Sequence, residues 1–349
     1  MDQRLKRITY GQPSRFAMTR ISLVTIFLHL LLAARLFAGD AAVIDGAKKE
    51  GTLVFYTTMD IQNSKPLLDA FTKKHPFVRG DLVRLGGTAM VSRIITEAQA
   101  GANRFDVALG ISPSYVPMRD RNLIAPYLSP ELPNLYEDTY EAKGYWTTVY
   151  LNTLVLGYNT KVIPRNDLPK TYEDLLKPQY KQKFIIDIEN YDVFVGLSQE
   201  WGQEKAINYF RGLAKQEPVF LRGNTNRANM VSVGERSMTF VYAQVIERMK
   251  QTGAPVDWIP LEPVNVEVNV AMLAAKAAHP NTGKLFIDYL ISKDGQEFLK
   301  TFRRIGPRKD VKPDPPKLFE GFRRRIVSPD AYKNLREITK LHNDALGVR

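Results

Sequence analysis

The sequence predicts an α/β fold built on two open, mostly parallel β-sheets that are joined by two long strands. Patterns of buried strands alternate with helical patterns from Leu53 onward, the order that produces parallel sheets. Two extended stretches, residues 146–159 and 264–272, are long enough to pass from one sheet into another. A chain of 349 residues is also long enough for two domains.

Three strands are predicted in the first part of the chain, at residues 53–56, 81–85 and 105–109. The first is a continuous apolar run, as in strands buried on both faces. A helix that opens at Pro66 is expected after it. Apolar residues at helical spacing predict another helix over residues 91–98, after the second strand. The result is a βαβαβ unit.

Polar or small residues follow each of these strands. In open α/β sheets, ligands bind outside the carboxyl ends of the strands. We therefore expect the loops 57–60, 86–88 and 110–112 to face a ligand, through hydroxyls, backbone N–H groups and a helix N-terminus near Thr88. The candidate binding residues in these loops are Thr57, Thr58, Asp60, Gly87, Thr88 and Ser112.

A second sheet is predicted from strands at residues 184–188 and 237–242, with a helix at 200–213 between them. The stretch 264–272 alternates strictly, with valines and Met272 on one face and polar residues on the other. Two helices then follow from about residue 281, the second beginning at Ser292.

The N-terminus has the pattern of a secretory signal peptide, assigned to residues 1–38. Basic residues precede an apolar core at 21–32, and small residues follow it. We expect cleavage after Ala38 or Ala41 and translation from Met18; an uncleaved anchor is the alternative. The chain has no cysteine, so neither disulfides nor a lipoprotein anchor is expected. We therefore expect a protein that is exported to the periplasm and is freely soluble there.

The net charge of +12 raises the question of nucleic-acid binding. Some of the excess lies in the signal peptide, and the remaining basic residues are spread along the chain. Export makes a nucleic-acid partner a poor fit, and we predict none.

The sequence lacks the usual motifs for catalysis, cofactor binding and metal binding. The glycines at Gly46 and Gly51 precede a strand, whereas a phosphate-binding loop follows one. The four histidines lack the spacing of metal ligands. No G-x-S-x-G nucleophile turn is present. We predict no catalytic residue, cofactor or bound metal.

Several motifs together resemble a known family: AKKEGTLVFYTT, FDVALG, LVLGYNT, LPKTYEDLLKPQYKQKFIIDI and HPNTGKLFIDYLISKDGQEFL. In this order they resemble the periplasmic solute-binding proteins of ABC importers, in the type II group that includes ferric-iron-binding proteins. The resemblance implies two lobes joined by two crossing hinge strands, with the solute held between them. On that basis residues 40–153 and 265–349 form the first lobe, and 154–264 the second.

Ferric iron is not the ligand we expect. The iron-binding proteins carry two adjacent tyrosines after the strand that here ends at Tyr242, and their positions fall on Gln244 and Val245. Their histidine after the first strand falls near Asp60. One phenol and one carboxylate are a poor ligand set for Fe³⁺.

A small anion or zwitterion is the predicted solute instead. Helix N-termini near Thr88 and Asn224 would favour negative charge, and Asp60, Asp187 and Glu189 could hold an ammonium group. The structural alternative is that Gly86 and Gly87 only form a turn and that Thr88 only caps a helix. The remaining candidate binding residues are Tyr150, Glu189, Asn224, Thr225 and Tyr242.

The function predicted is a monomeric, non-enzymatic receptor that delivers a solute to a membrane permease and its ATPase. Two alternatives stay open. A periplasmic enzyme on a similar scaffold would turn its ligand over, and a sensor would pass ligand occupancy to a membrane kinase by the same closure.

Overall fold

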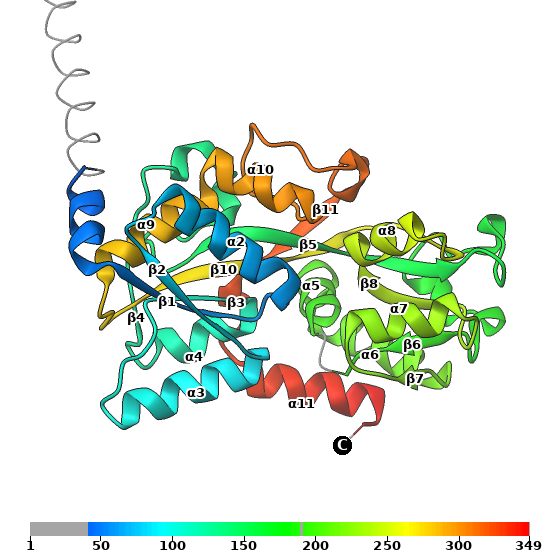
Figure 1. Cartoon of the computed structure of the whole chain (residues 1–349). Coiled ribbons are helices and arrows are strands. Elements are labelled where there is room, and N and C mark those ends of the chain that lie inside the picture. The colour runs from blue at the N-terminus through cyan, green and yellow to red at the C-terminus, as the bar shows by residue number, and fades with distance from the viewer. Residues whose placement is uncertain (1–40, 189–190, 349) are drawn as a thin grey trace, which may run out of the picture.

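The structure, a computed structural model, describes residues 41–188 and 191–348. Its helices and strands lie in two lobes, connected by long strands that run across the middle of the molecule (Figure 1). The predicted signal peptide, residues 1–38, and the candidate residue Glu189 lie outside the described residues.

The first lobe contains the predicted βαβαβ unit. Each strand ends at a candidate loop, and α2 and α9 pack on one face of the sheet through Phe55, Phe71 and Phe286, whose rings lie 4.8 to 4.9 Å apart. Its elements are β1 (Thr52–Thr57), α2 (Ile61–Lys74), β2 (Arg79–Arg84), α3 (Gly87–Gln99), β3 (Val107–Ile111), the 3₁₀ turn η1 (Ser112–Ser114), α4 (Tyr115–Arg119), β4 (Ile124–Ala125), α9 (Pro280–Ile291) and α10 (Lys293–Thr301).

The second lobe has its own aromatic core, in which Tyr172, Phe184 and Phe240 pack with ring centroids 5.1 to 5.8 Å apart. Its elements are β6 (Phe184–Ile186), α5 (Asp192–Trp201), α6 (Gln203–Lys215), β7 (Val219–Phe220), α7 (Asn224–Ser232), β8 (Met238–Tyr242), α8 (Ala243–Gln251) and β9 (Val256–Ile259).

Two strands, β5 (Thr147–Asn159) and β10 (Val264–Ala274), connect the lobes. They pair antiparallel with each other and are buried along their whole length. The sheet order is β2-β1-β3-β10-β5-β8-β6-β7. The α/β fold and its crossing strands are therefore confirmed. The strand pairs β1–β2, β1–β3, β6–β7 and β6–β8 are parallel, and β10 and β5 join the two sheets into one mixed sheet.

The C-terminal part of the chain crosses the molecule again. Strand β11 (Arg324–Val327) pairs parallel with β10, the 3₁₀ turn η8 (Pro329–Tyr332) follows, and α11 (Leu335–Leu346) packs on α6 of the second lobe. The lobe boundaries stay a prediction, and α11 packs outside the lobe to which the sequence assigned it.

Three helix boundaries differ from the prediction. Helix α2 begins at Ile61, not Pro66, because the Asp60 carboxylate caps it by accepting a hydrogen bond from the backbone N–H of Asn63 at 3.1 Å. The helix expected over 200–213 is two helices, separated at Gly202, whose φ of +88° ends α5. Thr88 is the second residue of α3 and not its cap, since Gly86 takes that position.

Candidate functional site

The polar face of β10 lies at the junction of the lobes. Asn265, Glu267 and Asn269 alternate with valines, and each of the three is at most 2% exposed. A strand buried on both faces does not need polar residues for solubility, and buried polar groups require partners. This alternation therefore points to a polar cluster at the junction.

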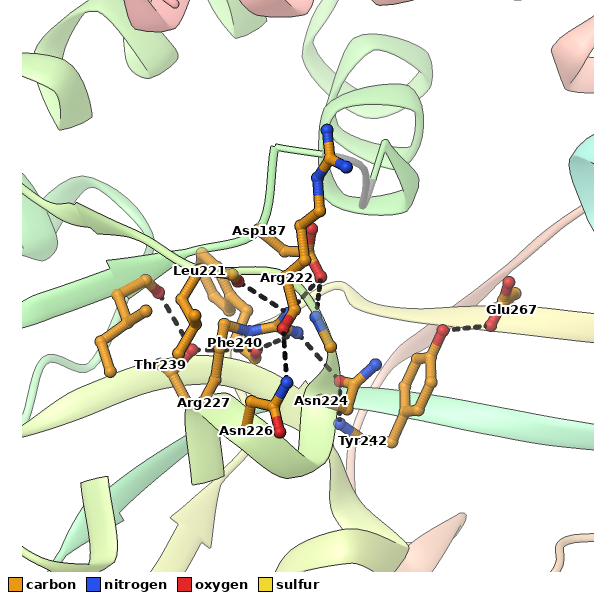
Figure 2. A network of polar contacts seen from close by, with 12 residues as sticks. Asp187, Leu221, Arg222, Asn224, Asn226, Arg227, Thr239, Phe240, Tyr242 and Glu267 are labelled. Atoms are coloured by element: carbon orange, nitrogen blue, oxygen red, sulfur yellow. Dashed lines mark hydrogen bonds and ion pairs between the residues drawn. The ribbon is translucent and has the colours of Figure 1, made fainter. Parts of the chain in front are cut away.

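Glu267 joins both crossing strands to the start of α8. Its carboxylate accepts a hydrogen bond from Asn152 Nδ2 on β5 at 3.1 Å. It also accepts one from the Tyr242 hydroxyl at 2.5 Å, which Figure 2 shows. Gln244, in the first turn of α8, donates to Asn152 Oδ1 at 2.7 Å. Burial, followed by the charge of Asp192, raises the pKa of Glu267 to about 8. Glu267 is therefore mostly protonated at neutral pH.

Arg304, just after α10, lies beside this group and is only 8% exposed. Its guanidinium donates to Asp60 Oδ2 at 3.2 Å and, at a long 3.4 Å, to Asn152 Oδ1. It also lies 4.5 Å from the centre of the Tyr150 ring, a cation–π contact. Its Nε has no hydrogen-bond partner among the described residues. A nearly buried cation is thus held by one ion pair at the edge of the cluster.

Arg248 reaches the same place from the second lobe. It lies one helical turn after Gln244 on α8, is half-buried, and makes no hydrogen bond or ion pair with residues 41–188 or 191–348. Burial lowers its pKa, the charge of Arg304 lowers it further, and Asp60 opposes both. Two guanidinium groups from different lobes therefore lie within electrostatic reach of each other and of the Asp60 carboxylate. We call this group the crossing cluster: Asp60, Tyr150, Asn152, Tyr242, Gln244, Arg248, Glu267 and Arg304.

A second polar network lies within the second lobe, around the fully buried Arg227. Figure 2 shows its guanidinium between Asp187, Asn224 and the strand that carries Phe240. Arg227 forms an ion pair with Asp187 and donates to Asn224 Oδ1 at 3.0 Å and to the carbonyl oxygens of Phe240 and Leu221 at 3.2 and 3.4 Å. We call this group the Arg227 network.

Asn224 serves this network. Its side-chain oxygen accepts from Arg227 and also from the backbone N–H of Tyr242 at 3.2 Å. It thereby fixes the N-terminus of α7 against the end of β8. Thr225, the next residue, is exposed.

The loop after β1 is mostly occupied by internal hydrogen bonds. The Thr57 hydroxyl is buried and accepts from the backbone N–H of Met59 at 3.0 Å. The Thr58 N–H donates to the carbonyl oxygen of Leu109 at 3.0 Å. Of this loop, Asp60 is the candidate that reaches the crossing cluster.

The other two loops differ in how they are used. Ser112 is buried, and its hydroxyl donates to the carbonyl oxygen of Val268 at 3.0 Å, which ties η1 to β10. Gly87 is the first residue of α3, and Thr88 is exposed beside it. The helix has no side-chain cap, so its first N–H groups are available to a ligand. Arg84, just before this loop, lies close enough to lower the pKa of the Tyr150 phenol, which burial raises to about 12.

The structure thus brings Asp60, Tyr150 and Tyr242 together. Sequence reasoning missed five members of the crossing cluster. The alternation of polar and apolar residues on β10 could have identified Glu267 as a site residue, because polar residues in a strand expected to be buried need partners. Arg248 and Arg304 carry no such signal in the sequence. The missed residues are Asn152, Gln244, Arg248, Glu267 and Arg304.

Two properties of residues 41–188 and 191–348 bear on function. No group of three or more His, Cys, Asp or Glu side chains is arranged to hold a metal ion there. Nor does that part of the chain contain a helix with the length and apolar character needed to cross a membrane.

Two known proteins are similar to this chain in sequence. An Fe(3+)-binding periplasmic protein of Serratia marcescens is 24% identical over 283 residues, which cover 78% of this chain and 82% of the relative. An uncharacterised protein of Haemophilus influenzae is also 24% identical, over 285 residues, covering 77% and 81%.

Among solved structures, iron-bound HitA from Pseudomonas aeruginosa matches with a TM-score of 0.76 at 21% identity, covering 84% of this chain and 99% of HitA. AfuA from Actinobacillus pleuropneumoniae, with fructose-6-phosphate bound, matches with a TM-score of 0.74 at 21% identity, covering 86% and 99%. At this identity, both matches establish the fold.

A family model described as bacterial extracellular solute-binding protein matches residues 106–333, which is more than half of the chain. This range includes β10, α8 and most of the crossing cluster. The predicted resemblance is confirmed, and the chain belongs to the bacterial extracellular solute-binding proteins, non-enzymatic receptors of ABC transport.

Proposed function

We propose that this receptor binds a small anion between its lobes, held by Arg248 from the second lobe and Arg304 from the first. The observation that carries the proposal is their shortage of partners. Arg304 has one close carboxylate and one long contact to Asn152, and Arg248 has no hydrogen bond within the described residues. Buried or half-buried guanidinium groups normally have acceptors, and an anion between them would supply these.

Helix N-termini add to the positive potential. Helix α8 begins at Ala243 beside the cluster, and neither it nor α3 has a side-chain cap. Free N–H groups in the first turn of a helix carry partial positive charge and bind anions. Phosphate, phosphonate and carboxylate groups are the anions that suit an arginine pair.

Binding of this kind would also drive closure. Without an anion, like charges on Arg248 and Arg304 oppose the approach of the lobes at this point. An anion that contacts both favours the closed arrangement, because a ligand shifts a conformational equilibrium by its difference in affinity for the two states. In this proposal, Arg248 and Arg304 are the residues through which the solute drives the predicted hinge closure.

Ferric iron remains disfavoured in this proposal. The Tyr242 hydroxyl donates to Glu267, and burial raises the pKa of Tyr242 well above its usual value. A phenol must lose its proton to bind Fe³⁺, and this environment opposes that loss. Gln244, at one of the expected tyrosine positions, donates to Asn152 instead. The iron named for HitA and the Serratia protein is therefore not carried over to this chain, whereas the fructose-6-phosphate bound to AfuA shows that this fold accepts an anion.

The zwitterion form of the prediction loses part of its support. Asp187, offered as a partner for an ammonium group, forms an ion pair with the buried Arg227 and accepts from the Gly223 N–H at 3.2 Å. Asp60 remains at the crossing cluster, but it pairs with Arg304. We propose an anion without a required ammonium group.

Isothermal titration calorimetry tests the proposal. The purified protein is titrated with inorganic phosphate, aliphatic phosphonates, sugar phosphates, citrate and a ferric salt. We expect binding of at least one anion, weakened about 10- to 100-fold by Arg248→Gln, because a hydrogen bond to a charged group contributes about 1.5 to 3 kcal/mol. Lys250→Gln, on the same helix but paired with Asp257, is the matched control and should bind as the wild type does. Tight Fe³⁺ binding with a tyrosinate absorption band, unaffected by Arg248→Gln, would overturn the proposal.

A further inference from the structure

The C-terminal segment 324–346 crosses both lobes. We call it the strap. It begins with β11 on the crossing strand β10, continues through η8 beside α4 of the first lobe, and ends with α11 on α6 of the second. Figure 1 shows α11 lying across the lower side of the molecule, from near α4 to α6. Any change in the angle between the lobes must therefore move or stretch the strap.

The end of the strap is packed firmly onto the second lobe. His342 is fully buried, and its ring lies 5.2 to 5.7 Å from the rings of Tyr191, Phe194 and Phe210. Leu346 is also buried in the core of that lobe. This anchor is apolar and extensive, so α11 moves with the second lobe.

The beginning of the strap is attached to the first lobe by a polar contact. Arg119 Nη1 on α4 donates to Asp330 Oδ1 in η8 at 3.0 Å. Two residues later, the fully buried Tyr332 donates its hydroxyl to Asp192, the first residue of α5 in the second lobe. Contacts to opposite lobes thus lie two residues apart in η8.

Two cavities lie beside these contacts. A cavity of about 830 Å³ separates α4 from the first turns of α11, with Pro117 and Asp120 on one side and Arg336 on the other. Another of about 370 Å³ lies between α5 and α11. Segment η8 packs beside these spaces through the buried Pro329 and Tyr332 and lies against η1 and α4, and the Arg119–Asp330 ion pair adds a polar attachment to the first lobe.

We propose that the strap restrains the opening between the lobes in the ligand-free protein, with the Arg119–Asp330 ion pair as its attachment to the first lobe. The lobes then meet three times, through β5, β10 and the strap. Loss of the attachment leaves the two crossing strands alone to set the angle, which widens the range of angles that the free protein samples.

Spin labels test this in the full chain without ligand. The chain has no cysteine, so Lys73→Cys on α2 and Lys215→Cys at the end of α6, both exposed, give one labelled site per lobe. Pulsed electron spin resonance then measures the distribution of distances between them. Asp330→Asn removes the carboxylate of the strap. The matched control is Asp120→Asn, which removes the other carboxylate bound to Arg119, at 2.9 Å and on the residue that caps the end of α4.

We expect Asp330→Asn to broaden the distance distribution and shift its mean, with Asp120→Asn matching the wild type. Tyr332→Phe, which removes the contact to Asp192, should broaden it as well. The proposal is overturned if Asp330→Asn gives the same distribution as Asp120→Asn. Since the experiment uses no ligand, its result is independent of whether the solute is an anion.

Discussion

The two arginine-centred groups of this molecule differ in how completely their charges are satisfied. Arg227 is fully buried and holds a carboxylate, a side-chain amide and two backbone carbonyls. Arg304, almost as buried, has one carboxylate at the exposed edge and one long contact, and Arg248 beside it has no partner among the described residues.

This difference separates a structural role from a binding role. A buried ion pair whose guanidinium also donates to an amide and two backbone carbonyls fixes one arrangement of the chain, as Arg227 does although its Nε has no hydrogen-bond partner among the described residues. A guanidinium that is desolvated yet short of acceptors is placed at some cost, and the cost is recovered when a ligand supplies the acceptors. The Arg227 network should therefore respond to mutation in stability, and the crossing cluster in binding.

The largest effect is expected from Arg227→Met. It removes the guanidinium that pairs with Asp187, whose side chain is 10% exposed, and breaking a buried pair in this way costs about 3 to 5 kcal/mol. Urea denaturation should show that loss in the free energy of unfolding. Arg248→Gln is the comparison, and it should change the unfolding free energy by less than about 1 kcal/mol. Equal losses in the two variants would erase the distinction between the two groups.

A pH-dependent effect is expected from Glu267, the neutral acid of the crossing cluster. Its pKa is raised from 4.5 to about 8, so the folded protein holds this proton more tightly than the unfolded chain does. The stabilisation is complete below the unfolded pKa of about 4.5 and is lost as the pH rises through about 8.

Glu267→Gln removes this titration and keeps a neutral polar side chain. Relative to the wild type, the variant should gain stability between about pH 5 and pH 9, on the order of a few kcal/mol. Thermal unfolding at several pH values measures this difference. Asp192, whose pKa burial raises to about 6, interacts electrostatically with Glu267, so the substitution also changes the contribution of Asp192 to the difference between the two curves. Parallel stability curves would show that Glu267 does not hold a proton in the fold.

The smallest effect is expected from Asp60→Asn. Asparagine caps helices about as well as aspartate, so the cap on α2 and the stability should be kept. Arg304 loses its competing carboxylate, so an anion should bind a few-fold more tightly, by about 0.5 to 1 kcal/mol. Calorimetry with the tightest-binding anion measures the change. Weaker binding by this variant would show that Asp60 itself contacts the solute.

The fold was largely predictable from the sequence, whereas the site was predictable only in part. Strand runs such as residues 53–56 and the alternation at 264–272 are local signals, and the structure confirms them as β1 and β10. The start of α2 was missed because Pro66 is a strong local signal, yet Asp60 caps the helix earlier.

The arginines were missed for a different reason. Arg304 and Arg248 lie on separate helices or their ends, and only the folding of both lobes around β5 and β10 brings them together. Thr57 and Ser112 show the converse, because each follows a strand as a binding residue should, and each has its hydroxyl hydrogen-bonded to the backbone. The position of a residue at the end of a strand indicates where a site lies. Whether its side chain bonds to the backbone or remains available to a ligand depends on the packing around it.

The most direct test of the central claim is a double-mutant cycle on Arg248 and Arg304. Affinities of the tightest-binding anion are measured for the wild type, Arg248→Gln, Arg304→Gln and the double variant. If one anion contacts both arginines in the closed state, the two losses are not additive, and the coupling energy exceeds about 0.5 kcal/mol. Losses that simply add, or an affinity that neither substitution changes, would contradict a shared anion between the lobes.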